Sequence, residues 1–210
     1  MKITIFGAGN MSRAIGIRAL SGGHAVRVAA RSSDHSDTLI DELRGRTNDA
    51  DVDRADPQHA SQSDIVVLAV PYETGKQLAG ELHDTIAVEI SNPVNFDTFD
   101  SLTVPPGTSA AEEVARVAGP GVHVVKAFNT VFASTLADGQ VGGSPLDVFI
   151  AADDADAKAA VAELVAGGGQ VPIDAGPLRR ARELEGLGFL HMTLQEPLGL
   201  RWRSTVKLLR

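Results

Sequence analysis

The sequence predicts an α/β fold in which a doubly wound, mostly parallel sheet is covered by helices and followed by a short C-terminal helical and extended appendage. Apolar, β-branched runs alternate with helical patterns along most of the 210 residues. Hydrophobic residues make up 43% of the chain, but aromatic residues only 4%. A core built from valine, alanine, leucine and isoleucine suits parallel strands that are buried on both faces.

The first 33 residues combine a strand, a glycine turn, a helix and a second strand. Residues 2–6 are apolar and β-branched, residues 10–20 have a helical pattern, and residues 25–30 form the next apolar run. This is the plan of a dinucleotide-binding βαβ unit, so we expect a Rossmann fold. Gly7 permits the tight turn, and Gly9 leaves room for a pyrophosphate against the first amides of the helix.

The end of the second strand indicates which dinucleotide is bound. A site for NAD usually places an acidic residue there, where it bonds the ribose 2′-hydroxyl. This sequence has Arg31, Ser32 and Ser33 instead, and the nearest acid is Asp34. A guanidinium and two hydroxyls are suited to a 2′-phosphate. We therefore predict NADP(H) rather than NAD(H).

The remaining elements continue the alternation. Further strands are expected at residues 64–70, 87–90, 122–128, 147–151 and 171–174. Helices are expected at residues 37–43, 57–62, 72–83, 131–138, 155–166 and 178–196, and another begins after Ser109, which has Glu112 at the capping-box spacing. Residues 199–209 are predicted to be extended. We assign residues 1–176 to an NADP-binding domain and residues 177–210 to a helix and tail that complete the second-substrate site and a dimer contact.

Composition excludes several classes of function. The net charge of −8 argues against nucleic-acid binding, and the lack of cysteine excludes disulfides and thiolate chemistry. No apolar run is long enough to span a membrane and no signal peptide is evident, so we expect a cytoplasmic enzyme. Residues 179–210 carry seven basic and three acidic side chains, against 12 and 24 in the rest. This basic tail is either a solvated face, a subunit contact or a seat for an anionic ligand.

The loops after the strands are the candidate site, because ligands of such sheets lie beyond the carboxyl ends of the strands. The segment 69–71 should cross the adenosine and pyrophosphate side of the cofactor, and the segments 92–93 and 128–129 should flank the nicotinamide. The six histidines show no metal-ligand spacing, and no nucleophile motif is present. We expect neither a metal nor a catalytic side chain, since hydride transfer between two bound rings requires only positioning.

Six motifs, taken together and in order, resemble those of a known family. They are Gly7-Ala8-Gly9-Asn10-Met11, Arg31-Ser32, Leu68-Ala69-Val70-Pro71, Ser91-Asn92-Pro93-Val94, Lys126-Ala127-Phe128-Asn129-Thr130 and Asp174-Ala175-Gly176-Pro177-Leu178. The pattern resembles the NADPH-dependent reductases of the deazaflavin coenzyme F420 over nearly the whole chain. The sequence departs from that family at Ser12, where a third glycine is usual, and at residues 201–204.

The resemblance implies reversible hydride exchange between NADPH and coenzyme F420 in a homodimer. We expect NADP(H) to contact Gly7, Ala8, Gly9, Asn10, Met11, Arg31, Ser32, Ser33, Ala69, Val70, Pro71 and Asn92. By analogy with the family, Asn92, Pro93, Val94 and Asn129 line the deazaflavin side. Coenzyme F420 carries a phosphate and a polyglutamate chain, and we hypothesise that these are attracted by Arg179, Arg180, Arg201 or Arg203.

Two other functions stay open on the sequence alone. The first is an NADPH-dependent reductase of another small acceptor, namely a flavin, a ferric chelate, a quinone or an imine. The start of the chain also resembles pyrroline-carboxylate reductases, which carry a large helical dimerisation domain that has no counterpart here. The second is a non-catalytic module that senses NADPH and signals to a partner.

Overall fold

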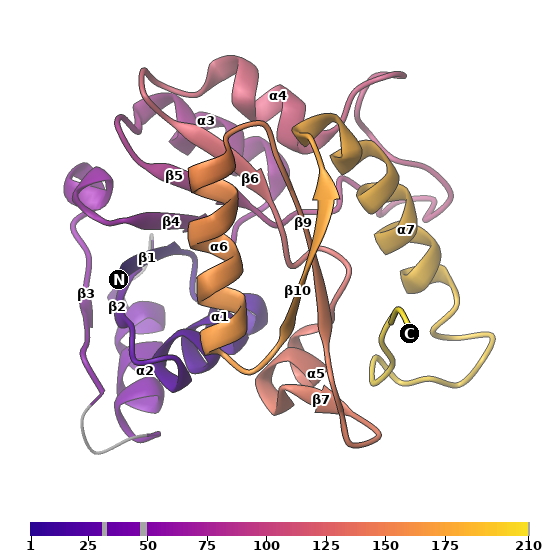
Figure 1. Ribbon diagram of the computed structural model, residues 1–210, viewed down its shortest axis with the longest axis horizontal. Helices are drawn as coiled ribbons and strands as arrows, with labels where there is room; N and C mark the ends of the chain where they lie inside the picture. The colour runs from indigo at the N-terminus through magenta and orange to yellow at the C-terminus, as the bar shows by residue number, and fades with distance from the viewer. Residues whose placement is uncertain (31–32, 47–49, 210) are drawn as a thin grey trace.

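One large sheet organises the computed structural model, which describes residues 1–30, 33–46 and 50–209 (Figure 1). Within these residues, eight strands follow the order β10-β9-β6-β5-β4-β1-β2-β3, and β7 and β8 form a separate two-stranded ladder. Neighbouring strands of the large sheet are parallel, except that β9 runs antiparallel to β6. The predicted mostly parallel α/β fold is confirmed.

Strands and helices alternate along the chain. The strands are β1 (Lys2–Phe6), β2 (Ala25–Ala29), β3 (Val52–Arg54), β4 (Ile65–Leu68), β5 (Ile86–Glu89), β6 (His123–Lys126), β7 (Gln140–Val141), β8 (Ser144–Pro145), β9 (Asp147–Ala152) and β10 (Val171–Gly176). The helices are α1 (Asn10–Ser21), α2 (Ser33–Arg44), α3 (Tyr72–Glu81), α4 (Ala110–Val117), α5 (Ala133–Asp138), α6 (Ala155–Gly167) and α7 (Ala181–Thr193). Two short 3₁₀ helices, η1 (Pro57–Gln62) and η2 (Leu178–Arg180), precede β4 and α7.

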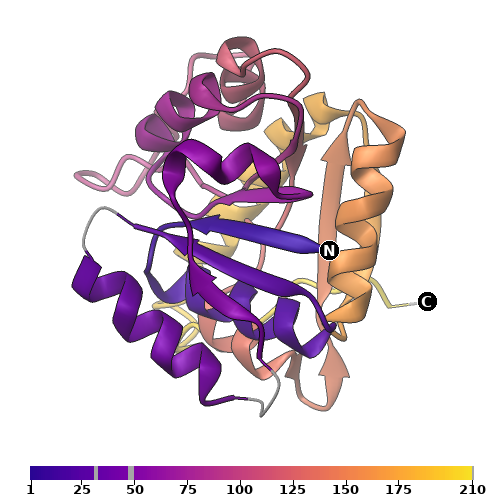
Figure 2. The same cartoon turned by 90° about the vertical axis from the view of Figure 1, so that its left-hand side faces the viewer.

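Helices cover both faces of the sheet. Successive strand residues point to opposite faces, so Ile5 packs into a core with α1, α2, α5 and α6, whereas Phe6 packs into a second core with α3 and α4. In Figure 2 the N-terminal strands lie between α2 on one side and α3 and α4 on the other. Among the described residues, no helix is long and apolar enough to cross a bilayer.

A buried lysine joins the carboxyl ends of β5 and β6 to α7. The Nζ atom of Lys126 donates hydrogen bonds to Glu89 Oε2 (2.5 Å), Glu185 Oε1 (2.9 Å) and the Ser91 carbonyl (2.6 Å). Glu185 also accepts a bond from the Ala110 amide at the start of α4 (3.0 Å). Burial lowers the pKa of Lys126, but the two carboxylates outweigh this effect and raise it, so the lysine stays charged. Burial raises the pKa of Glu185.

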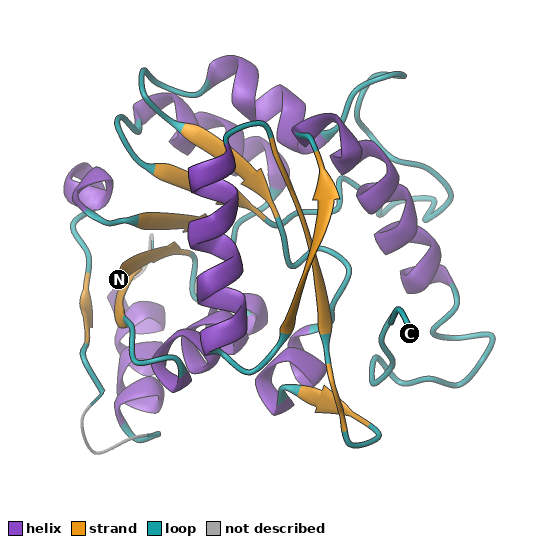
Figure 3. Cartoon of the chain, viewed as in Figure 1, coloured by secondary structure: helices purple, strands orange, loops and turns teal. Residues whose placement is uncertain are grey.

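Several segments differ from the prediction. The β7–β8 ladder was not predicted, and the helix expected at 178–196 is η2 followed by α7, which ends at Thr193. The sequence pattern does not reveal β3, because only Val52 of its three residues is buried. Helix α2 begins at Ser33 rather than at residue 37, since its first turn is polar and carries no apolar periodicity. The segment 199–209, which was expected to be extended, is loop throughout (Figure 3). Side-chain contacts described below, rather than strand pairing, hold this tail.

Two histidines are buried, one at each end of the chain. The N-terminal amine of Met1 donates to His24 Nδ1 (3.3 Å). His191 Nδ1 donates to the Thr130 carbonyl (3.4 Å), which leaves Nε2 to accept from the Ser204 hydroxyl (2.8 Å). Burial lowers the pKa of both imidazoles; the N-terminal charge adds to the effect at His24, and the Thr130 contact partly offsets it at His191.

Replacing Lys126 by methionine should destabilise the protein strongly, because the Glu89 and Glu185 carboxylates then stay buried without a counter-ion. We expect a loss of about 3–5 kcal/mol in the free energy of unfolding, measured by urea titration. The control is Lys158→Met, whose partner Asp174 is largely exposed, and which should cost less than about 1 kcal/mol. Equal losses in the two variants would contradict the importance of the buried network.

Stability should fall as the pH decreases through 6.5, the ordinary histidine pKa. A lowered folded-state pKa means that the unfolded chain binds more protons, so acid favours unfolding. Carboxylates with a lowered pKa also make the protein less stable as the pH falls. The contribution of the histidines is therefore isolated by comparing the variants His24→Gln and His191→Gln with the parent protein. Each should lose less stability than the parent between about pH 7 and about pH 5. Identical pH slopes in the parent protein and in both histidine variants would refute the assignment.

Candidate functional site

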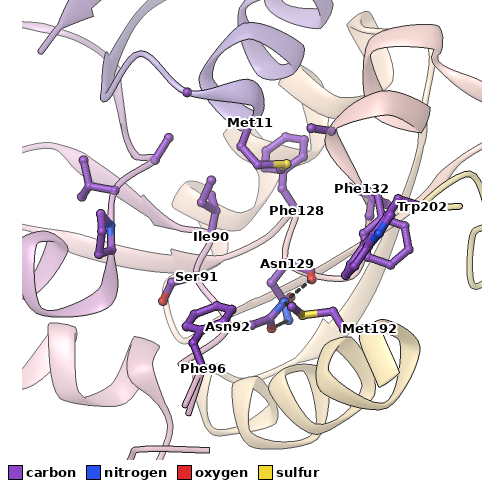
Figure 4. Close-up of a pocket in the computed structure, with 16 residues that line it drawn as sticks. Met11, Ile90, Ser91, Asn92, Phe96, Phe128, Asn129, Phe132, Met192 and Trp202 are labelled. Carbon is purple, nitrogen blue, oxygen red and sulfur yellow. Dashed lines mark hydrogen bonds between the residues drawn. The ribbon is translucent and has the colours of Figure 1, made fainter. Parts of the chain in front are cut away.

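Two cavities lie at the carboxyl ends of the parallel strands. The first, of about 570 Å³, is enclosed by the glycine turn, the end of β2 and α3. The second, of about 420 Å³, lies between the loops after β4, β5 and β6 and is bordered by α7 and the C-terminal tail (Figure 4). Gly9, Val70 and Pro71 line both cavities, so one extended ligand can reach from the first into the second.

The glycine turn separates the two cavities. Gly7 has a φ of 108°, and a Cβ atom there would lie 2.3 Å from the Ala69 carbonyl oxygen, so the turn requires glycine. A Cβ on Gly9 would meet nothing within 4 Å, which leaves the backbone open to a ligand. Gly9 caps α1 without a side-chain hydrogen bond, and the first turn holds no acidic residue. The first amides of α1 are therefore available to an anion.

Ser12, which stands in place of a third glycine, is fully buried under this turn. Its Oγ atom lies 3.2 Å from the position of a Cβ on Gly7. Within the described part of the chain this hydroxyl has no hydrogen-bond partner. Serine is thus accommodated by the packing of α1 on the sheet and does not close either cavity.

An amide pair forms the floor of the second cavity. Asn129 Nδ2 donates to Asn92 Oδ1 (2.9 Å) and to the Leu184 carbonyl (2.8 Å), and Asn92 Nδ2 donates to the Asn129 carbonyl (2.8 Å) (Figure 4). These bonds join the loops after β5 and β6 to α7. Gly188 makes the approach of α7 possible, because a Cβ there would lie 2.6 Å from Asn92 Oδ1.

Two polar atoms at this cavity lack a partner. Ser91 Oγ and Asn129 Oδ1 are buried, and neither has a hydrogen bond among the residues that the structure describes. Buried polar atoms are nearly always satisfied, so these two are the polar groups beside the cavity that remain to be paired. A primary amide such as the carboxamide of nicotinamide offers both a donor and an acceptor, and the polar side chains that line this cavity are compatible with that group.

No titratable side chain is found among the described residues that line the second cavity. The walls are mostly apolar, with Met11, Ile90 and Phe128 around the Asn pair. Two partly exposed aromatic residues, Phe96 and Trp202, also line the cavity. Such a cavity can hold flat rings and exclude water. Its described walls supply no general acid, and no base that would activate the Ser91 hydroxyl; such an arrangement is compatible with hydride transfer, which depends on positioning.

Most residues expected to bind the cofactor lie at these cavities. The first cavity is lined by Gly7, Ala8, Gly9, Val70 and Pro71, and the second by Gly9, Met11, Ala69, Val70, Pro71, Asn92 and Asn129. Asn10 lines a smaller depression beside the glycine turn, together with Arg13 and Glu42. The residues therefore gather as the sequence suggested; that they bind a cofactor stays a prediction.

Other predicted residues lie elsewhere or cannot be placed. Pro93 and Val94 are buried and line neither cavity: the Pro93 carbonyl accepts the Thr103 amide (2.7 Å), and Val94 pairs with Leu102. Their assignment to the substrate stays a prediction without a contact to support it. Arg31 and Ser32 lie outside the described residues. Ser33 begins α2, but its side chain is not described.

Several lining residues were not expected from the sequence. Phe132, Met192 and Trp202 line the second cavity, and His35 lines the first. They carry no local motif, because they come from a loop, a helix end and the tail. A signal that was available is composition: Trp202 is the single tryptophan in a chain with few aromatics.

The basic tail does not form a seat for an anion at either cavity. None of Arg179, Arg180, Arg201 and Arg203 lines them. Arg180 pairs with Glu183 (3.0 Å), and Arg203 pairs with Asp138 (2.7 Å). The hypothesis that these arginines attract the charged chain of coenzyme F420 therefore has no support from their positions.

Comparisons with known proteins indicate a class of enzyme. Residues 2–93 match the family described as NADP oxidoreductase coenzyme F420-dependent. The F420-dependent NADP reductase of Methanothermobacter thermautotrophicus is 27% identical over 207 residues, covering 88% of this chain and 85% of the reductase. The solved structure of a putative F420-dependent NADP reductase from Arthrobacter sp. FB24 has 27% identity and a TM-score of 0.83, with complete coverage of both chains.

A longer relative shares the same region. Metalloreductase STEAP3 of Rattus norvegicus is 30% identical over 189 residues, which is 89% of this chain. The chain spans 36% of the length of that metalloreductase. The family match and the two F420-dependent reductases indicate an NADP-dependent oxidoreductase with a Rossmann-like sheet. Over residues 2–93 this chain is similar to the coenzyme F420-dependent NADP oxidoreductases, and over most of its length it is similar to an F420-dependent NADP reductase.

Proposed function

We propose that this protein transfers a hydride between NADPH and coenzyme F420. The observation that carries the proposal is the second cavity, which has apolar walls, an amide pair and no described titratable side chain, next to a glycine turn suited to a pyrophosphate. The similarity to an F420-dependent NADP reductase over most of both chains supports this acceptor. The homodimer and the cytoplasmic location stay predictions from the sequence.

The two cavities suggest how the cofactor is divided. The pyrophosphate lies against the first amides of α1, where the helix dipole favours negative charge. The adenosine half then occupies the first cavity, and the nicotinamide half reaches the second past Gly9 and Pro71. There Ser91 and Asn129 line the cavity and would hold the polar carboxamide.

The choice of acceptor is supported by the absence of a titratable side chain among the described residues that line the second cavity. Bound NADPH supplies the hydride, which carries two electrons. The protein positions the two rings and excludes water. An acceptor whose conjugated ring disperses the incoming negative charge needs no acid beside it, whereas an imine or a carbonyl requires a proton donor. A deazaflavin meets this condition.

A flavin is the second candidate acceptor, because its conjugated ring meets the same condition. The similarity to metalloreductase STEAP3 is compatible with an acceptor other than coenzyme F420. That similarity covers about a third of the longer protein, so it does not by itself support a metal as the substrate of this chain. The family consists of oxidoreductases, which weighs against a purely sensory module.

A panel of acceptors tests the proposed reaction. Purified protein with NADPH should reduce coenzyme F420 fastest, riboflavin more slowly, and 1-pyrroline and ferric citrate most slowly. The rates are measured from the loss of NADPH absorbance and, for coloured acceptors, from the loss of the acceptor's own absorbance. NADH in place of NADPH should be at least about tenfold less effective, because it lacks the 2′-phosphate. Fastest turnover with 1-pyrroline or ferric citrate, or no turnover with any acceptor, would overturn the proposal.

Gly188→Ala should impair the reaction by displacing the amide pair. The added methyl group meets the Asn92 amide, so the Asn92–Asn129 contact opens and the rings lose their alignment. We expect kcat/KM to fall at least about tenfold, since misplacement by about 1 Å is costly in hydride transfer.

The matched control is Gly186→Ala on the same helix, where a Cβ meets nothing within 4 Å. This variant should keep kcat/KM within about twofold and should gain up to about 1 kcal/mol of stability from its higher helix propensity. If both glycine variants behave alike, the amide pair has no role in positioning the substrates.

A further inference from the structure

An aromatic cluster from three parts of the chain forms one side of the second cavity. The ring of Phe132, in the loop after β6, lies 4.3 Å from His191 on α7 and 5.0 Å from Trp202 in the tail, measured between ring centroids. Phe132 and Trp202 meet edge to face. In Figure 4 this pair and Phe96 stand on opposite sides of the Asn92–Asn129 pair.

The backbone under Trp202 is strained. Arg201 and Trp202 have φ angles of 54° and 58°, a left-handed conformation that bulky residues rarely adopt. Strain of this kind persists only where the surroundings enforce it, and it concentrates at functional sites. The two consecutive left-handed residues turn the tail so that the indole lines the cavity.

Several contacts enforce this conformation. The Trp202 amide donates to Gln195 Oε1 (3.0 Å), and the Ser134 hydroxyl donates to the Trp202 carbonyl (2.6 Å). Gln195 Nε2 also donates to Ser204 Oγ (3.0 Å), and the Ser204 hydroxyl donates to His191 Nε2 (2.8 Å). The tail is therefore held on both sides of Trp202 by α7 and α5.

Despite this support, the indole is not covered. Trp202 keeps 46% of its surface exposed, and Phe96 across the cavity keeps 72% exposed. The polar contacts of residue 202 given above are made by its backbone, and its indole packs against Phe132 while nearly half of the residue stays exposed. A cavity with exposed aromatic faces and no described charge is complementary to a flat, conjugated ring.

We propose that Trp202 is the stacking surface for the acceptor ring and determines acceptor selectivity. This rests on the proposed hydride transfer to a conjugated acceptor. The indole favours flat polycyclic acceptors over compact ones, because only a flat ring gains contact with its whole face. Removal of the indole should weaken NADPH binding less than acceptor binding, since the proposed adenosine and pyrophosphate sites lie at the other cavity.

Steady-state kinetics test the assignment. Trp202→Leu should raise KM for coenzyme F420 and riboflavin about five- to tenfold, the size of an aromatic contact beyond simple burial. KM for NADPH should rise less than KM for the two flat acceptors. Trp202→Phe should restore most of the loss because it keeps an aromatic face. The control is Leu209→Ala, which removes an exposed apolar side chain of the same tail outside the cavity lining and should leave every constant unchanged.

Fluorescence provides a readout that does not depend on turnover. Trp202 is the only tryptophan, so selective excitation reports on this side chain alone. Titration of the NADP⁺-bound protein with riboflavin or coenzyme F420 should reduce emission by static quenching, in which intensity falls more than the lifetime. A lifetime that shortens in proportion to the intensity would indicate energy transfer to a ring bound elsewhere, and would overturn the proposal.

The outcomes separate this proposal from the one on which it rests. If the parent protein reduces coenzyme F420 or riboflavin but Trp202→Leu keeps its KM values, the stacking role is wrong and the hydride transfer stands. If the parent protein reduces none of the conjugated acceptors, the hydride transfer fails and the stacking role fails with it. A KM that rises more for the flat acceptors than for NADPH, and is rescued by phenylalanine, supports both.

Discussion

The buried contact between Lys126 and two glutamates determines the geometry of the candidate site. Glu89 ends β5 and Lys126 ends β6, and the amide partners Asn92 and Asn129 follow each of them by three residues. Glu185 belongs to α7, which also supplies the Leu184 carbonyl to Asn129. One ammonium group thus fixes the three elements that bring the amide pair together.

An ionic contact of this kind has a physical cost that apolar packing does not. Removing one ammonium and two carboxylates from water is unfavourable, and the α4 amides, which bond Glu185, offset only part of it. The directional hydrogen bonds of Lys126 hold the ends of β5 and β6 in a fixed register. Apolar side chains would hold β5, β6 and α7 together but would let the following loops slide, and the amide pair would lose its alignment.

The two cavities beside this ionic contact suit different parts of the ligands. The first offers backbone amides and small residues, which suit a pyrophosphate and its nucleoside. The second offers flat apolar walls and two amides without a described acid. Hydride transfer depends on alignment and dryness rather than on acid or base groups, so rigidity at Asn92 and Asn129 matters more than reactivity.

The sequence by itself determined the sheet, most of its helices and the loops that line the cavities. Local periodicity and the Gly7–Gly9 turn are short-range signals, so a linear pattern suffices to place β1, α1 and the loops at the strand ends. Only the tertiary structure decided that Trp202 and Met192 reach the second cavity, that Pro93 and Val94 do not line it, and that Lys126 is buried between two acids. Those contacts join residues far apart in the chain, and no local pattern records which partners a folded sheet brings together.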